Sequence, residues 1–255
     1  MQVLRIDPHA HLYDSYPLKV WCAAVLNNLR IQSEVCGAVI VVDREGQDSF
    51  KRLGQDVGEF GVFSVLQSLA RPIVGRVDME SRSFVVVRGV QYVSEERLEV
   101  LGLGVERSVP DGAPCMELIA RIRGEGGVTC IPWSPGKWLG ARGRVVARAL
   151  HEYGPTGLTV GDIAIRSAFG PPSRLLARAR RTGIPILRGT DPLPRAQDAA
   201  LVGSYGIQLR LGTDADWSSF VHRPADFLSN RFNMLQAWGE PNSVLTSALR
   251  FLSTL

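Results

Sequence analysis

The chain has 255 residues, of which 45% are hydrophobic, a formal net charge of +4 and a pI of about 9.1. This is enough sequence for a sizeable buried core, and no apolar run approaches the roughly 18 residues that a membrane-spanning helix needs. The basic residues are spread along the chain without a concentrated stripe interleaved with aromatics, so we expect neither a nucleic-acid nor a membrane partner. Four scattered cysteines and the lack of a basic, apolar leader predict a cytoplasmic protein with reduced thiols.

Hydrophobic periodicity predicts strands and helices that alternate along most of the chain. We expect strands at residues 3–6, 38–42, 61–66, 84–87, 99–103, 128–131, 157–162, 184–187 and 207–211. We expect helices at residues 16–34, 47–59, 111–125, 140–153, 171–182, 224–237 and 244–252.

The alternation of strand and helix, about seven times at spacings of roughly 25 to 40 residues, is typical of parallel β/α architecture. No linker rich in Pro, Gly or Ser divides the chain, so we expect one domain over residues 1–255. The two candidate folds are an open doubly wound sheet and a closed barrel. No Gly-x-Gly-x-x-Gly follows the first strand, and polar residues stand at many strand ends. Both observations favour an α/β fold with a distorted, TIM-like barrel of seven to eight β/α units.

A pair of histidines, His9 and His11, follows the first apolar run. On an extended segment, residues i and i+2 point the same way, and neutral imidazole is the commonest metal ligand. The pair therefore predicts one side of a divalent metal site, to be completed by a carboxylate from elsewhere in the barrel. The alternative is a polar loop whose histidines only bond to nearby backbone.

Two acidic residues at later strand ends are candidates for that carboxylate. Asp191 has two roles open to it, as a metal ligand or as the acceptor of a proton from a metal-bound water. It is also compatible with a turn that caps a helix. Asp162 is a similar but weaker candidate for a catalytic residue, and Asp7 is expected to orient a histidine or to serve in a turn.

An anionic substrate would need cations and amide groups at the same end of the barrel. Lys137 and Arg142 lie in a loop with two Trp and several Gly residues, which suits either anion binding or a tight loop that covers the barrel end. Arg188 flanks Asp191 and is a further candidate for anion binding, and Gln91 is a candidate substrate contact at another strand end. Outside this site, the Arg178–Arg181 cluster is expected on an exposed helix face. His151 in a helix and His222 in a late loop are expected to be structural or solvent-exposed and not ligands.

The stretch Ile6-Asp7-Pro8-His9-Ala10-His11 resembles the opening motif of the polymerase and histidinol phosphatase (PHP) superfamily and of the related amidohydrolases. Residues 87–92 with 98–104, and Gly189-Thr190-Asp191-Pro192, resemble later motifs of the same superfamily, in the same order. The resemblance implies a distorted seven-stranded barrel that hydrolyses phosphoesters with water activated on one to three divalent ions. Two positions depart from it, because Gln91 stands where the superfamily has Glu and Leu193 where it has His. These departures leave at most one well-built metal position, from His9, His11 and Asp191.

The sequence thus predicts a metal-dependent hydrolase, with Zn, Mn or Fe as its ion and a small anionic substrate. Two alternatives stay open. One is a non-catalytic barrel that binds a ligand or partner at a degenerate metal site. The other is a metal-free lyase or aldolase that forms a Schiff base on Lys137.

Overall fold

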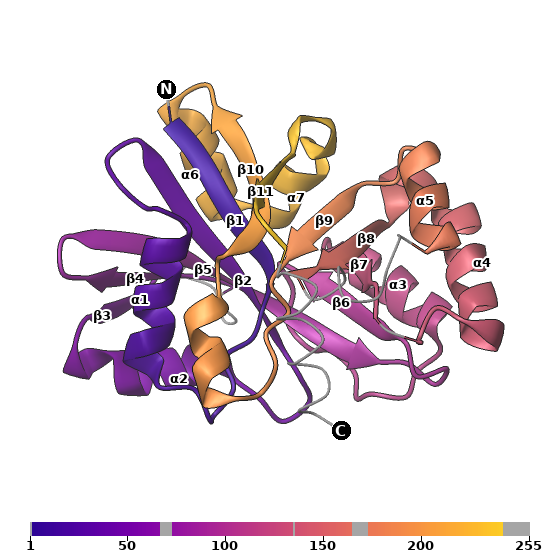
Figure 1. Ribbon diagram of the computed structural model, residues 1–255, viewed down its shortest axis with the longest axis horizontal. Coiled ribbons are helices and arrows are strands. Elements are labelled where there is room, and N and C mark those ends of the chain that lie inside the picture. The colour runs from indigo at the N-terminus through magenta and orange to yellow at the C-terminus, as the bar shows by residue number, and fades with distance from the viewer. Residues whose placement is uncertain (1, 67–72, 135, 165–172, 242–255) are drawn as a thin grey trace.

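The computed structural model describes residues 2–66, 73–134, 136–164 and 173–241 (Figure 1). Its strands are β1 (Gln2–Ala10), β2 (Val35–Asp43), β3 (Val62–Val65), β4 (Val74–Met79), β5 (Arg82–Val93), β6 (Glu99–Leu103), β7 (Val128–Pro132), β8 (Thr159–Ile163), β9 (Ile186–Gly189), β10 (Tyr205–Leu211) and β11 (Gln236–Gly239). Its helices are α1 (Leu18–Asn28), α2 (Ser49–Asp56), α3 (Cys115–Gly124), α4 (Gly140–Gly157), α5 (Arg174–Arg181), α6 (Asp214–His222) and α7 (Pro224–Ser229). No helix among these residues has the length and apolar character that crossing a membrane would require.

The strands form one mixed sheet that curls into a nearly closed barrel. Nine strands follow one another in the order β11-β10-β1-β2-β5-β6-β7-β8-β9, and β4 and β3 extend the sheet from β5. Strands β1, β2, β5, β7, β8 and β9 run in the same direction, whereas β6 and β10 run against them. The barrel closes where β9 meets β1, because the N–H of Asp191 just after β9 donates to the carbonyl of His9 at 2.8 Å. The six strands that run together direct their carboxyl ends to one face of the barrel.

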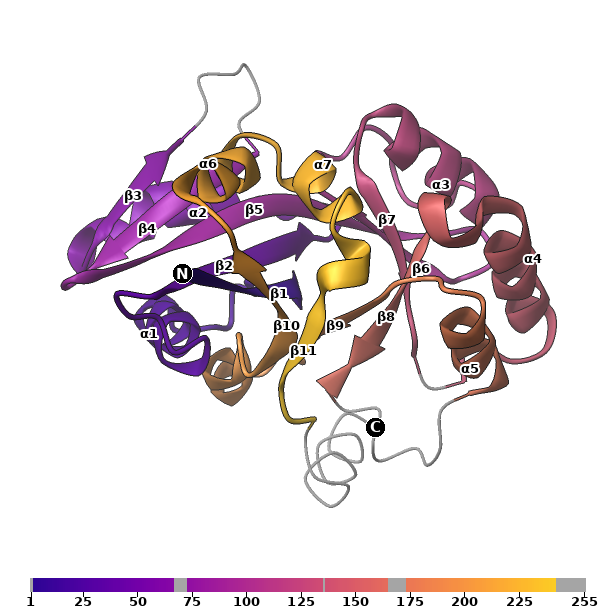
Figure 2. The ribbon, with the colours of Figure 1, turned by 90° about the horizontal axis from the view of Figure 1, so that it is seen from above.

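Three hydrophobic clusters hold this arrangement. One fills the barrel interior and is covered at one end by α6 and α7, through side chains such as Phe220 and Phe227. A second lies outside the barrel under α1 and α2, and includes the buried Trp21. The third lies outside it on the opposite side, under α3, α4 and α5. Figure 2 shows the two outer helix groups on either side of the barrel.

Strand β1 carries an irregularity that decides where its histidines point. At the start of β1 the even-numbered residues face the interior core. Between Asp7 and Ala10 the pairing with β2 shifts, so that three steps along β1 match two along β2. One extra residue reverses the alternation of a strand. The odd-numbered His9 and His11 therefore face the interior, while Ala10 packs in the outer core.

The prediction of a distorted α/β barrel is confirmed, although the regular alternation of strand and helix is not. Strands β5, β6 and β7 form an antiparallel meander in which no helix separates β5 from β6. The predicted helix over residues 224–237 is wrong beyond Ser229, because Gln236–Gly239 forms the edge strand β11 on β10. His222 is the last residue of α6 and does not lie in a loop. The predicted helix at 244–252 lies outside the described residues.

Candidate metal centre

His11 is held so that its Nε2 atom carries a lone pair. Its Nδ1 lies 3.0 Å from the carbonyl oxygen of Val42, which can only accept a hydrogen bond, so Nδ1 is the protonated nitrogen. Burial is the main cause of a lowered His11 pKa, and the ring is therefore neutral. The remaining nitrogen, Nε2, then has no proton to donate.

The Asp191 carboxylate faces this nitrogen and that of His9. Its Oδ1 lies 3.4 Å from His9 Nε2 and 3.5 Å from His11 Nε2. Burial tends to raise the pKa of Asp191, but His9, His11 and the positive charge of Lys137 together hold it below its usual value. The carboxylate oxygen and the His11 lone pair are both acceptors, and two acceptors this close repel each other unless a cation lies between them.

The unpaired ring nitrogens of His9 are a second indication of a metal-binding site. Its side chain is buried, and neither ring nitrogen has a hydrogen-bond partner among the described residues. Buried polar atoms are normally paired, because an unpaired one costs free energy. The donor atoms of His9, His11 and Asp191 all lie within 4.8 Å of one another. This set of two imidazoles and one carboxylate fits a divalent transition metal, and the cluster could hold one ion.

Asp7 links the two chain segments that carry these side chains. It is fully buried, and its Oδ1 accepts from the N–H of His9 at 3.2 Å and from the N–H of Thr190 at 3.0 Å. Its Oδ2 accepts from the Thr190 hydroxyl and from the N–H of Gly203 at 3.0 Å. The carboxylate therefore fixes the end of β1 against the residue that precedes Asp191, as is usual for groups that orient metal ligands.

The loop after His11 is fixed in a similar way. The ring of Tyr13 stacks on the His11 ring with centroids 4.9 Å apart, and Trp21 Nε1 donates to the carbonyl of His11 at 3.0 Å. Arg52 on α2 donates to the carbonyls of Tyr13 and Tyr16 at 2.5 and 2.6 Å. The hydroxyl of Tyr16 reaches across to the carbonyl of Leu193. These contacts leave the His11 side chain little freedom.

Lys137, predicted as a catalytic and anion-binding residue, lies close enough to lower the pKa of Asp191. Its Nζ also donates to Glu99 Oε1 at 2.6 Å, at the start of β6. Because β6 runs against its neighbours, its first residue lies at the same barrel face as the carboxyl ends of the other strands. This contact with Glu99 engages the amine that the Schiff-base alternative would need to be free, and so it speaks against that alternative.

The other predicted site residues have different surroundings. Asp162 and Arg188 are paired positions on β8 and β9, with Arg188 Nε 4.0 Å from Asp162 Oδ2, and Tyr205 donates to the same oxygen. Neither belongs to the metal-binding cluster of the described residues. Arg142 lies in the first turn of α4 and not in a loop, and it donates to the carbonyl of Gly136 in the loop before the helix. Gln91 is buried near the carboxyl end of β5, and its Oε1 has no partner in the described part of the chain.

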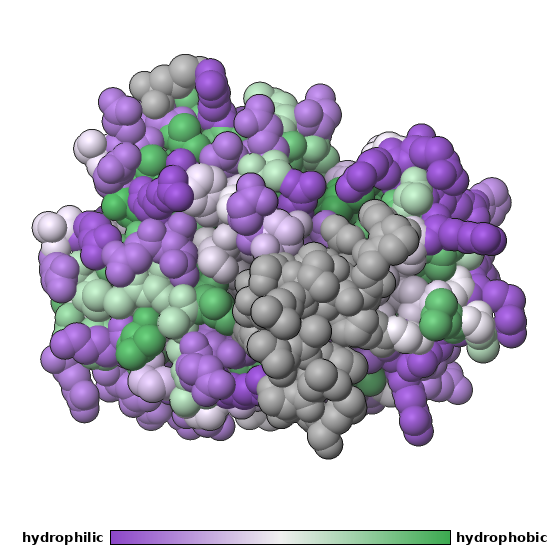
Figure 3. Space-filling view, viewed as in Figure 1, coloured by the Kyte–Doolittle hydropathy of each residue, from purple (hydrophilic) through white to green (hydrophobic). Residues whose placement is uncertain are grey.

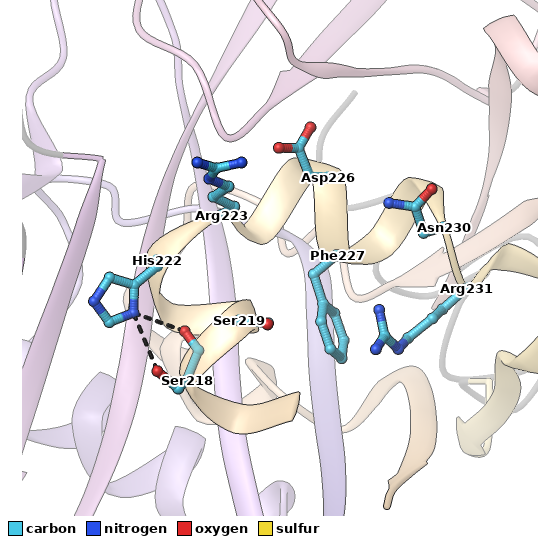
Figure 4. Close-up of a pocket in the computed structure, with 8 residues that line it drawn as sticks. All are labelled: Ser218, Ser219, His222, Arg223, Asp226, Phe227, Asn230 and Arg231. Atoms are coloured by element: carbon cyan, nitrogen blue, oxygen red, sulfur yellow. Dashed lines mark hydrogen bonds between the residues drawn. The ribbon is translucent and has the colours of Figure 1, made fainter. Parts of the chain in front are cut away.

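A separate pocket of about 480 Å³ lies on α6 and α7, and the cluster residues are not part of its lining (Figure 4). In it, His222 Nδ1 faces the carbonyl of Ser218 at 2.8 Å. Arg231 pairs with Asp216 at 2.7 Å and lies over the Phe227 ring. Arg231 at this pocket is thus already paired with an acidic side chain from outside its lining, and we assign no function to the pocket.

Comparison with known proteins shows that the fold is similar to that of a solved structure. No protein-family model matches the chain, and no curated protein matches it. Among solved structures it is similar to PsfC from Pseudomonas syringae PB-5123, with a TM-score of 0.58 and 16% identity over 100% of both chains. The lesion-specific endonuclease PfuEndoQ from Pyrococcus furiosus has a TM-score of 0.48 and 9% identity over 86% of this chain and 56% of its own. Endonuclease Q in complex with a 27-mer duplex has a TM-score of 0.46 and 9% identity over 87% of this chain and 57% of its own. These likenesses show a fold and no activity.

The expectation that nucleic acid is excluded as a partner is corrected by these structures, because an endonuclease with a bound duplex is among them. The sequence argument was weak because residues spread along a chain can gather in space. Helix α5 contributes four arginines and α4 three, and the two helices pack against one another. Arg180 and Arg181 are exposed, as predicted for this cluster, whereas Arg178 is half-buried. Figure 3 shows hydrophilic residues over the part of the surface where α5 lies in the same view.

Proposed function

We propose that this protein is a metal-dependent hydrolase of the phosphoesterase type, with one barrel domain over residues 1–255 that resembles the PHP superfamily. His9, His11 and Asp191 would hold one divalent ion, of Zn, Mn or Fe. The observation that carries the proposal is the 3.5 Å approach of Asp191 Oδ1 to the unprotonated Nε2 of His11. A cation between the two acceptors accounts for it.

A divalent ion at this position would supply a water of lowered pKa and would polarise a phosphoryl oxygen. The protein's own groups have separate tasks. Asp191 is held ionised, and we propose that it accepts the proton of the attacking water as well as binding the ion. Lys137 supports that ionised state through its charge, and Gln91 offers an unpaired amide oxygen to the substrate. Asp162 and Arg188 contact each other and stay weaker predictions as catalytic and substrate-binding residues.

The experiment is metal analysis of protein that is purified without added metal. We expect about one equivalent of a transition metal in the wild type and much less in His9→Ala/His11→Ala. The matched control is His151→Ala/His222→Ala, which removes the other two histidines of the chain and should keep the metal. Equal, near-zero metal in all three proteins would refute the proposal.

A second function, a non-catalytic binding barrel, is supported by the neutral Gln91 and by Leu193 at the two departures from the PHP pattern. A screen of phosphomonoesters, phosphodiesters, lactones, amides and single- and double-stranded DNA distinguishes the two. Metal-dependent turnover by the wild type that is lost in Asp191→Asn excludes the non-catalytic barrel. Metal binding without turnover of any of these substrates favours it.

A further inference from the structure

One cation beside the metal-binding cluster has no acidic partner among the described residues. Arg44 follows directly on β2, and its side chain is exposed. Its Cζ lies 4.7 Å from the centroid of the Tyr13 ring, and Tyr13 in turn stacks on His11 at 4.9 Å. The guanidinium therefore lies at the rim of the site. Its distance from the centre of the His11 ring cannot exceed the sum of these two separations.

The other cations around the cluster are already engaged. Lys137 is bound to Glu99 at 2.6 Å. Arg52 donates to the carbonyls of Tyr13 and Tyr16 and lies 3.7 Å from Asp56. Among the described residues, the side chain of Arg44 makes only the ring contact, so its guanidinium keeps its hydrogen-bond donors for a ligand.

The electrostatics agree with this position. Burial is the main cause of the lowered pKa of His11, and the charge of Arg44 adds to it. Burial likewise raises the pKa of Tyr13, with the carboxylates of Asp191 and Glu99 adding to the rise and Arg44 acting against it. The positive field of Arg44 thus reaches the residues around the metal ligands. An arginine held over an aromatic ring is also partly preorganised, which lowers the entropy lost when it binds an anion.

We propose that Arg44 binds a second anionic group of the substrate, a carboxylate or a phosphoryl group, while the reacting group lies at His9, His11 and Asp191. The substrate class is therefore a small molecule with two anionic ends. This inference rests on the proposed function for the position of the reacting group. It differs from the sequence-based expectation, which assigned the anion to Lys137, Arg142 and Arg188.

The test uses two non-hydrolysable probes that differ by one carboxylate, ethylphosphonate and 3-phosphonopropionate. Their affinities are measured by titration calorimetry for the purified full chain, with and without one equivalent of Zn²⁺. We expect the wild type to bind 3-phosphonopropionate about 10-fold or more tightly than ethylphosphonate, because a charge-assisted guanidinium pair is among the strong hydrogen bonds. Arg44→Gln should abolish this preference, and Arg44→Lys should restore part of it.

The control is Arg123→Gln, which removes another arginine that lies over a tyrosine ring, at 5.6 Å on α3, and should keep the preference. The inference is overturned if the wild type shows no preference, or if Arg44→Gln keeps it. It is also overturned if Arg44→Gln weakens binding of a single-stranded oligonucleotide but not of 3-phosphonopropionate, because the ligand would then be a nucleic acid.

This test separates the inference from the proposed function. If the preference depends on Arg44 with no metal present and none is retained on purification, the proposed hydrolase fails and the anion site stands. If metal is bound and turnover is found, Arg44→Gln should raise KM for a two-anion phosphoester about 10-fold while kcat changes by less than about twofold.

Discussion

The carboxylate of Asp7 accepts hydrogen bonds from both the backbone N–H and the hydroxyl of Thr190. Asp7 lies on β1 and Thr190 directly follows β9, so these bonds join the two strands that close the barrel. One carboxyl group thereby determines how far the end of β1 lies from the residue before Asp191. The candidate metal-binding cluster of His9, His11 and Asp191 depends on this link, because two of its side chains follow Asp7 and the third follows Thr190. Its removal should change metal binding more than it changes stability.

Thr190→Val tests this link with an almost isosteric change. It removes the hydroxyl donor to Asp7, and we expect metal affinity to fall about 10-fold, as is typical for groups that orient metal ligands. The matched control is Thr159→Val, which removes a buried hydroxyl that donates to the carbonyl of Thr129 at 2.8 Å, away from the cluster. Both variants should lose about 1 kcal/mol of stability. Competition with a metal indicator gives the affinities, and equal affinities for the two variants would contradict the prediction. The d–d spectrum of Co²⁺-loaded protein should change in Thr190→Val alone.

Gly189→Ala should weaken the barrel closure. A Cβ atom at residue 189 would come within 2.5 Å of His9 Cβ and 2.9 Å of His9 N, so β9 would have to move away from β1. We expect a loss of about 1–3 kcal/mol, as for other overpacked sites, together with weaker metal binding. Gly124→Ala is the control, because no atom lies within 4 Å of its added methyl group. Urea unfolding of both variants checks the prediction, which fails if Gly189→Ala is as stable as the wild type.

The stability of the metal-free protein should fall between about pH 4 and pH 6 because of Asp43. Burial raises the pKa of this carboxyl group to about 6, although the hydrogen bonds from Ser49 act to lower it. The folded state therefore binds the proton more tightly than the unfolded state, and this contribution is full below pH 4 and lost as the pH rises through 6. At 1.4 kcal/mol per pKa unit, the shift from 3.8 to about 6 corresponds to a loss of about 3 kcal/mol. Relative to Asp43→Asn, which cannot titrate at this position, the wild type should become less stable by most of this amount from pH 4 to pH 7. A difference that is constant across this range would show that Asp43 does not titrate in this way.

Zn²⁺ should stabilise the wild type against heat, and Asp191→Asn should remove most of that effect. Binding to the folded state alone contributes about 2.7 kcal/mol at a free metal concentration 100 times Kd. Asparagine suits the comparison, because residue 191 has a φ of 42°, a left-handed conformation that Asp and Asn tolerate better than Ala. Asp191→Asn should therefore match the wild type in metal-free Tm, which differential scanning calorimetry can show. An equal Zn²⁺-induced rise in Tm for both proteins would argue against Asp191 as a ligand.

The sequence predicts the approach of His9, His11 and Asp191 because the carboxyl ends of parallel strands meet at one face of a barrel. It does not reveal how the histidines come to face inward. The bulge in β1 leaves no mark in the hydrophobic pattern, and without it the alternation that begins with Leu4 and Ile6 would turn both rings outward.

Two other residues of the site were missed for different reasons. Arg44 comes two residues after the predicted strand 38–42, so the strand-end reasoning that selected Asp162 and Asp191 could have found it. Glu99 begins a strand, and its place at the site depends on the antiparallel direction of β6, which periodicity does not encode. Strand β11 was mistaken for a helix because four residues are too few for their pattern to be recognised.

The closure between β1 and β9 also bears on when the protein can acquire its ion during synthesis. The two imidazoles are synthesised more than 175 residues before Asp191, and before the Gly203 N–H that holds Asp7. A nascent chain that ends before β9 therefore offers only a weak two-histidine chelate. We expect a metal ion to be loaded only once β9 and residue 203 have been made, and metal retention to report on formation of this closure.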